Sequence, residues 1–409
     1  MGEESQRARW SLAIAALTLT VQNGIVIAFA VLYLPLVGEF GGSRAEVAAV
    51  QSTVFLLGGV GAPLVGYALD RLGPRRLFQG GAVLAALGLL AATQVTTLPL
   101  LLLTYGVVGG LGLAALGSQP NMVVAALWYP KARGKAIAVA DLGTGLGAFC
   151  LIPVAQTLVA LYGWRATLVV WAALLLAILV PVNAFQKFPR GMRLGRLARG
   201  GDGWSLTSAV RSSPFRWLFT CRFFSSMGFP LMNVHMVAFA VGAGIPPVQA
   251  AAALGTVSLV SLGGRLMTGW LSDRVGRAET LTLTYSSAAL GIACLFFLAW
   301  SRWPGWLFFY VIFYGLAQGS SGIVTSARAA DIFAGPSFGT IYGWVILGMG
   351  PGEAIGVWAG GAIYDLTGSY LWAFGFAVAV LVLGALSIWK VRPPEEALPP
   401  VSSLPRRST

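Results

Sequence analysis

Long stretches of this chain carry no charged side chain, and this feature restricts the fold most. Two of them run from Ser11 to Gly38 and from Leu77 to Tyr129. Only 10% of the 409 residues are charged, against ~25% in soluble domains. Because ~20 consecutive apolar residues are long enough to cross the hydrocarbon core as a helix, the sequence predicts an all-α polytopic membrane protein.

Hydropathy divides the chain into twelve segments of suitable length and composition, with basic or turn-forming residues between them. We expect transmembrane helices near residues 11–37, 46–69, 76–96, 98–126, 135–161, 165–185, 216–242, 247–272, 279–300, 304–330, 337–363 and 370–390.

A charged turn occurs twice and divides the chain into halves. The sequence GYALDRLGPRR contains Asp70, GWLSDRVGR contains Asp273, and the two aspartates lie 203 residues apart. Glycine rows at 143–147 and 348–352 repeat at a similar offset and let helices approach closely. The expected organisation is two pseudo-symmetric six-helix bundles (1–186 and 216–391), a cytoplasmic linker (187–215) and a disordered cytoplasmic tail (392–409).

The net charge of +13 follows the expected topology. If the first helix runs outward, 22 of the 27 Lys and Arg residues fall in cytoplasmic segments. This asymmetry predicts that both termini are cytoplasmic, and it removes the reason to expect a nucleic-acid partner. The excess of arginine over lysine is typical of a GC-rich bacterium, so the predicted location is a bacterial inner membrane.

The repeated turns resemble the loop signature of the major facilitator superfamily. Further stretches resemble its bacterial monocarboxylate transporter and oxalate/formate antiporter branch: EFGGSRA (39–45), WYPKARG (128–134), Gly264-Arg265 and YDLTGSY (364–370). The resemblance implies a secondary carrier for a small organic anion that works by alternating access, as a monomer and without a cofactor.

The sequence departs from that branch at two places. Oxalate exchangers have a lysine on helix 11, but residues 344–350 contain none. Ile27 and Ser118 stand where the branch tends to place tyrosines. The first departure favours a monoanion over a dianion.

Arg265 is the main candidate for binding substrate. It lies eight residues before Asp273, which places it ~12 Å from the end of its helix. A buried guanidinium at that depth needs a partner or a water-filled cavity. It could grip a substrate carboxylate through paired hydrogen bonds, as the resemblance also implies, or form a structural ion pair.

Asp141 is predicted at a similar depth on the fifth segment. One hypothesis is that it holds Arg265 when the site is empty and that protonation or substrate releases it. Alternatively, Asp141 lies near Asp273 and caps the charged turn. Monocarboxylate carriers often have a carboxylate one turn before the arginine, where this chain has Ser261.

His235 and Glu353 are further candidates for proton coupling. His235 is the only histidine, and it is either a proton relay or a neutral hydrogen-bonded pocket residue. Glu353 is either a proton site or an exposed group of the vestibule.

Hydrogen-bonding residues inside the predicted helices fit a mostly apolar pocket for a short organic acid, although each could equally join two helices. They are Gln22, Asn23, Tyr105, Ser118, Gln119, Asn121, Asn233, Tyr314 and Gln318, and His235 belongs with them.

The repeated turns are candidates for gating. Asp70, Arg71, Asp273 and Arg274 could be ordinary solvated loop residues, but their symmetric repetition favours latches between the halves on the cytoplasmic side. We expect them to control conformation without selecting the substrate.

Other classes find little support. The chain shows no phosphate-binding loop, metal-ligand cluster or nucleophile motif, so no enzyme activity, metal, cofactor or ATP-driven transport is expected. The predicted function is H⁺-coupled transport of a lactate- or pyruvate-like monocarboxylate. The alternatives are organic-anion exchange of the oxalate/formate type and, from a different class, multidrug efflux. Efflux would predict an acidic central cavity, whereas the central charge here is a cation.

Overall fold

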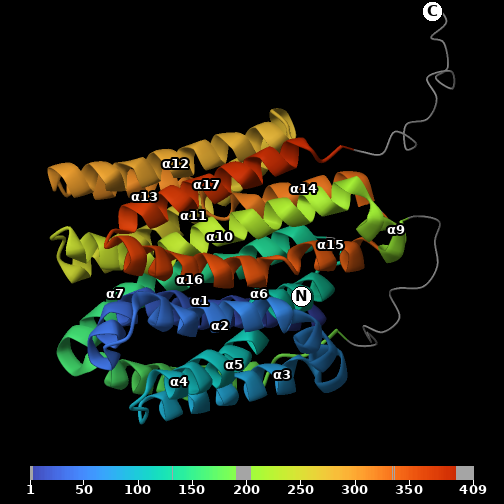
Figure 1. The fold of residues 1–409 in the computed structure, drawn as a ribbon. Coiled ribbons are helices and arrows are strands. Elements are labelled where there is room, and N and C mark those ends of the chain that lie inside the picture. The colour runs from blue at the N-terminus through green and yellow to red at the C-terminus, as the bar shows by residue number, and fades with distance from the viewer. Residues whose placement is uncertain (1–2, 131, 190–203, 334, 336, 393–409) are drawn as a thin grey trace, which may run out of the picture.

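The computed structural model describes residues 3–130, 132–189, 204–333, 335 and 337–392, and all regular secondary structure within these ranges is helical. Figure 1 shows the helices running alongside one another, with the N-terminal bundle (blue to green) below the C-terminal bundle (yellow to red). The all-α prediction is therefore confirmed.

The N-terminal bundle contains α1 (Glu3–Phe40), α2 (Arg44–Val60), α3 (Ala62–Ala92), α4 (Leu98–Leu101), η1 (Leu102–Gly109), α5 (Gly110–Ala115), α6 (Ser118–Trp128), α7 (Arg133–Leu174), η2 (Leu175–Leu179) and α8 (Val180–Asn183). The C-terminal bundle contains α10 (Ser213–Gly242), α11 (Pro247–Arg274), α12 (Arg277–Ser301), α13 (Gly305–Ala317), α14 (Ser320–Phe333), α15 (Phe338–Ile346), α16 (Met349–Thr367) and α17 (Tyr370–Trp389).

Two of these helices turn back on themselves at a glycine. Gly73 in α3 (φ 76°) and Gly163 in α7 (φ 79°) have left-handed, non-helical backbone conformations. The stretch Arg133–Asn183 has 51 residues, whereas ~20 residues are enough to cross the core. Each glycine therefore separates two membrane crossings.

Hydrogen bonds confirm the reversal at Gly163. The Arg165 Nε donates to the Thr93 carbonyl at 3.0 Å, whereas the Asn183 Nδ2 donates to the Thr18 hydroxyl at 3.0 Å. The chain thus returns from one end of the bundle to the other between residues 165 and 183. We call the end where α1 begins and α17 ends the terminal side, and the opposite end the far side.

The number of crossings follows from these reversals. Among the described residues, eight helical stretches are individually long and apolar enough to span a membrane, and the bent pair α2–α3 adds a ninth. Divided at Gly73 and Gly163, and completed by the broken span of α15 and α16, they give twelve crossings.

The predicted linker is only partly described. Residues 190–203 lie outside the described ranges, and the remainder contains the short helix α9 (Leu206–Arg211). α10 begins at Ser213, within the predicted linker. The predicted disordered tail lies outside the described residues, apart from Arg392.

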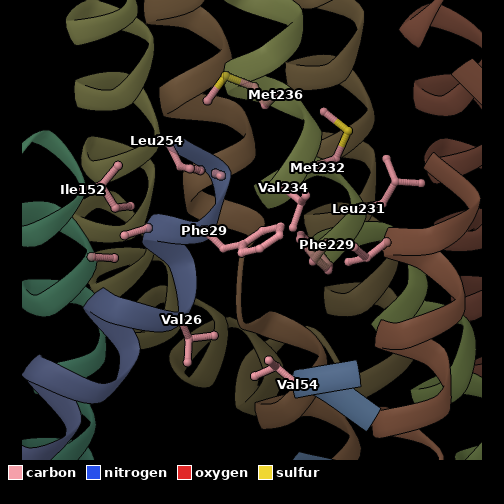
Figure 2. Packing of buried hydrophobic residues seen from close by; sticks show 14 of the residues in the cluster. Val26, Phe29, Val54, Ile152, Phe229, Leu231, Met232, Val234, Met236 and Leu254 are labelled. Carbon is pink, nitrogen blue, oxygen red and sulfur yellow. The ribbon is translucent and has the colours of Figure 1, made fainter. Parts of the chain in front are cut away.

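Glycines bring the two bundles into close contact. A Cβ at Gly350 of α16 would lie 2.8 Å from the Gly59 Cα of α2, and a Cβ at Gly145 of α7 would lie 2.6 Å from the Leu262 Cδ2 of α11. Such spacing allows van der Waals packing that larger side chains would prevent. Figure 2 shows the adjoining apolar cluster, which includes Phe29 of α1.

Candidate functional site

An ion pair joins the two bundles inside the membrane. The Arg265 Nη1 on α11 donates to the Asp141 Oδ2 on α7 and, at 3.3 Å, to the Thr144 hydroxyl. The two charged side chains are only 26% and 24% exposed. The pair proposed from helical depth is therefore present, and Asp141 does not stand at the charged turn of Asp273.

Thr144 connects this pair to a small cavity. The Asn23 Nδ2 of α1 donates to the Thr144 carbonyl at 2.7 Å, and Asn23 also lines a cavity of about 140 Å³. The polar residues around that cavity are Gln22, Asn23, Ser118 and Glu353. Four predicted site residues thus lie together, beside the segment that holds Arg265.

Glu353 connects the cavity to the C-terminal bundle. It lies on α16, and it is the lining residue that comes from outside α1, α2, α5 and α6. An exposed vestibule position was one of the two alternatives that the sequence left open for it. The structure instead places it on the wall of a cavity between the bundles.

Arg222 is a second intramembrane cation that the sequence assigned to no role. It lies on α10 with 6% of its surface exposed. Its Nη1 donates to the Ser321 hydroxyl at 2.8 Å, and its Nη2 contacts the Met349 Sδ of α16. Residues 344–350 lack the lysine that oxalate exchangers have, but Arg222 of α10 places a cation next to them, at Met349.

His235 lies in a different environment from the cavity. It is fully buried, and its ring packs against Tyr33 at 5.0 Å and Tyr370 at 5.4 Å between centroids. Its Nε2 lies 2.8 Å from the Val357 carbonyl. This is the arrangement of a hydrogen-bonded packing residue.

Several other candidates form helix–helix or local hydrogen bonds. The Tyr314 hydroxyl donates to the Phe229 carbonyl at 3.2 Å, and the Gln318 Nε2 donates to the Asn233 Oδ1 at 3.2 Å. Tyr314 and Gln318 are four residues apart in the sequence, and so are Phe229 and Asn233. One face of α13 and its C-terminal end therefore packs on one face of α10.

The remaining polar candidates lie in the N-terminal bundle. The Asn121 Nδ2 donates to the Leu116 and Gly117 carbonyls, where α5 gives way to α6. Tyr105 is 2% exposed and packs on Phe29, and Gln119 is exposed. None of these three is among the residues that line the cavity.

The charged turns make contacts within their own bundles. Asp273 pairs with Arg277 at 2.5 Å, and Arg277 also reaches Asp331 at 3.2 Å. The Arg71 guanidinium lies over the Tyr67 ring and that of Arg274 over the Trp270 ring. Asp70 is exposed. The predicted latch role of the turns remains a prediction.

The far side holds an inter-bundle contact that the sequence did not indicate. The Asp365 carboxylate of α16 accepts the Arg44 and Ala45 backbone N–H groups of α2 at 2.9 and 2.8 Å. The Arg44 guanidinium lies 3.7 Å from the Tyr364 ring centroid and donates to the Tyr370 hydroxyl. We call these four residues and Ala45 the far-side seal.

The arrangement has no features of a metal centre. Among the described residues, no group of three or more His, Cys, Asp and Glu side chains is placed to hold a metal ion. What the geometry offers is a guanidinium with a displaceable carboxylate partner, next to a small cavity between the two bundles that has four polar residues in its wall.

Comparison with known proteins decides the family. The family model described as Major Facilitator Superfamily matches residues 12–327. The chain belongs to this superfamily. It is therefore a multi-pass membrane transporter and not an enzyme, and the predicted fold of two six-helix bundles is confirmed.

Curated relatives agree with the predicted branch. Monocarboxylate transporter 13 of Bos taurus is 30% identical over 367 residues, covering 88% of this chain and 84% of that protein. The uncharacterized MFS-type transporter YcxA of Bacillus subtilis is 23% identical over 393 residues, covering 93% and 95%.

A solved structure supports the fold. A bacterial homolog of the human lysosomal transporter Spinster, in an inward-facing and occupied conformation, superposes with a TM-score of 0.73. It is 14% identical and covers 93% of this chain and 95% of its own.

Proposed function

We propose that this transporter moves small monocarboxylates such as lactate or pyruvate by alternating access, coupled to protons, with Arg265 as the carboxylate anchor. One observation carries the proposal: the Arg265–Asp141 pair bridges the bundles inside the membrane and adjoins the cavity through Thr144 and Asn23. The relatives named as monocarboxylate transporters support the substrate class.

The pair provides a way to link binding to movement. A substrate carboxylate competes with Asp141 for the Arg265 guanidinium, since both accept the same charge-assisted hydrogen bonds. Once Asp141 is displaced, a proton neutralises its partly buried charge. Because α7 and α11 belong to different bundles, this exchange also removes a polar link between them.

Among the three predicted proton sites, the contacts favour Asp141 and Glu353. Asp141 touches the anchor itself, and Glu353 lines the cavity. His235 packs between the rings of Tyr33 and Tyr370, and Tyr370 belongs to the far-side seal. This position makes His235 less suited to exchange protons with the cavity.

The orientation in the membrane follows from the charge distribution. The excess of Lys and Arg on the terminal side favours a cytoplasmic location for that side.

The test is uptake of radiolabelled L-lactate into proteoliposomes with and without an inward proton gradient. Losing one partner of a desolvated charge pair costs ~2 kcal/mol or more, so Arg265→Gln is expected to lower uptake at least about thirtyfold. Asp141→Asn is expected to retain exchange but lose the stimulation by the gradient. Arg302→Gln, exposed on the far side, serves as the control.

Two results would contradict the proposal. Uptake unchanged in Arg265→Gln would show that the arginine is structural. Uptake that depends on an internal anion, and not on the gradient, would show organic-anion exchange instead of proton coupling.

A further inference from the structure

The span formed by α13 and α14 is broken inside the membrane. α13 ends at Ala317, Gln318 has an extended ψ of 125°, and Gly319 has a φ of 90°. α14 then starts at Ser320 and runs for 14 residues. The first backbone N–H groups of a helix have no partner within it and form its positive end. A broken span therefore places such an end at membrane depth.

Both intramembrane arginines of the C-terminal bundle meet this break. A Cβ at Gly319 would lie 2.6 Å from the Arg265 Nε, so that guanidinium packs on the glycine. The Arg222 Nη1 donates to the Ser321 hydroxyl at 2.8 Å, and a Cβ at Gly322 would lie 3.8 Å from it. Two guanidinium groups from two helices thus flank four consecutive residues.

The two arginines differ in what neutralises them. Arg265 has the Asp141 carboxylate. Arg222 has only a hydroxyl and the Met349 thioether, a weak acceptor, as hydrogen-bonding contacts within the described ranges, and it forms no ion pair there. Glu353 follows Met349 by one helical turn and acts on Arg222 electrostatically, but it is not hydrogen-bonded to it in the described structure.

Several buried polar atoms at the break have no hydrogen-bond partner among the described residues. They are the Arg222 Nε, the Arg265 Nε, the Ser320 Oγ and the Gln318 Oε1. Ser320 is fully buried, and Arg222 is 6% exposed. The Gln318 Oε1 is an acceptor, but the other three atoms are donors, and two of them are cationic. A buried donor without a hydrogen-bond partner is costly, so these three donors indicate an anionic ligand.

We propose that the break is a two-arginine site and that the transporter also accepts a short dicarboxylate such as malonate. One carboxylate binds Arg265, which rests on the proposed function, and the second binds Arg222 with the hydroxyl groups and N–H groups at the start of α14. Fork-shaped guanidinium donors suit both carboxylates. A monocarboxylate occupies Arg265 alone.

The experiment measures inhibition of L-lactate uptake by malonate in wild type, Arg222→Gln and Arg222→Lys. In the wild type, malonate competes with lactate. In Arg222→Gln, the half-inhibitory malonate concentration rises about tenfold, as expected for the loss of one charge-assisted contact, while the KM for lactate stays within about twofold because lactate does not need Arg222. Arg222→Lys recovers part of the malonate affinity. Arg216→Gln, exposed on the same helix, is the matched control.

The outcomes separate this proposal from the proposed function. No competition by malonate in the wild type, or equal loss of lactate and malonate affinity in Arg222→Gln, overturns the second subsite without contradicting the proposed transport of lactate. If lactate is not transported at all, thermal stabilisation of the purified protein by malonate is measured instead. Stabilisation that is lost in Arg222→Gln and partly kept in Arg222→Lys then supports the subsite alone, and stabilisation that is unchanged in Arg222→Gln overturns it.

Discussion

The bundles meet differently at the two ends of the molecule. On the far side, Asp365 of one bundle caps the start of α2 in the other, and Arg44 lies against Tyr364 and Tyr370. On the terminal side, Asp273 pairs with Arg277 of its own bundle. Aspartate and arginine side chains thus join the two bundles on the far side, whereas on the terminal side they stabilise a single bundle. We conclude that this conformation is held shut at the far side.

The largest loss of stability is expected from a substitution at the glycine contact that joins the two bundles between α2 and α16. Gly59→Val places a side chain against Gly350, and overpacking costs ~1–3 kcal/mol or more. We expect a lower unfolding temperature and reduced transport, measured by thermal unfolding of the purified protein and by uptake.

The adjacent Gly58→Val is the matched control for the unfolding temperature, because a Cβ at Gly58 meets no atom within 4 Å. Gly58 also lines the cavity, so uptake is not compared between the two variants. Equal destabilisation by both substitutions would show that the α2–α16 contact does not determine the result.

An intermediate effect is expected from the far-side seal. Asp365→Asn removes the charge that accepts two backbone N–H groups but keeps one amide oxygen as an acceptor. The expected loss is therefore ~1 kcal/mol, the scale of the difference between hydrogen bonds to charged and to neutral groups. The seal should open more often. We expect faster labelling of Ser118→Cys in the cavity by an impermeant maleimide added to the far side, in a background in which the three native cysteines are replaced.

The smallest effect is expected at the terminal turn. Asp273 is 71% exposed in its pair with Arg277, and such pairs contribute ~0–1 kcal/mol. Asp273→Asn should leave far-side labelling and the unfolding temperature nearly unchanged. Far-side labelling as fast as in Asp365→Asn would contradict the conclusion that the far-side seal, and not the terminal turn, keeps the far side closed.

Much of the fold could be predicted from the sequence, because apolar runs and repeated turns are local signals. Spans, halves and the depth of Arg265 and Asp141 all follow from counting residues along helices. The same counting gives no direction around the helix axis. It could not show that Glu353 faces the cavity, or that Arg222 points at Met349 and Ser321.

Contacts between distant segments were also out of reach. Arg44 and Asp365 lie 321 residues apart, and both motifs were noted only as family resemblance. The break at Gly319 was missed because the apolar run over residues 304–330 predicts one continuous helix, and a glycine inside such a run does not by itself indicate a break.

The broken span has a mechanical consequence. A continuous helix bends as one elastic rod, so a tilt at one end is felt at the other. Between α13 and α14 that continuity is lost, and a change in a few torsions around Gly319 is enough to swing α14. Ser321 can therefore move with the terminal half of the bundle while Tyr314 keeps its packing on α10. The span can therefore bend at Gly319, which lies between the contacts of Arg265 and Arg222.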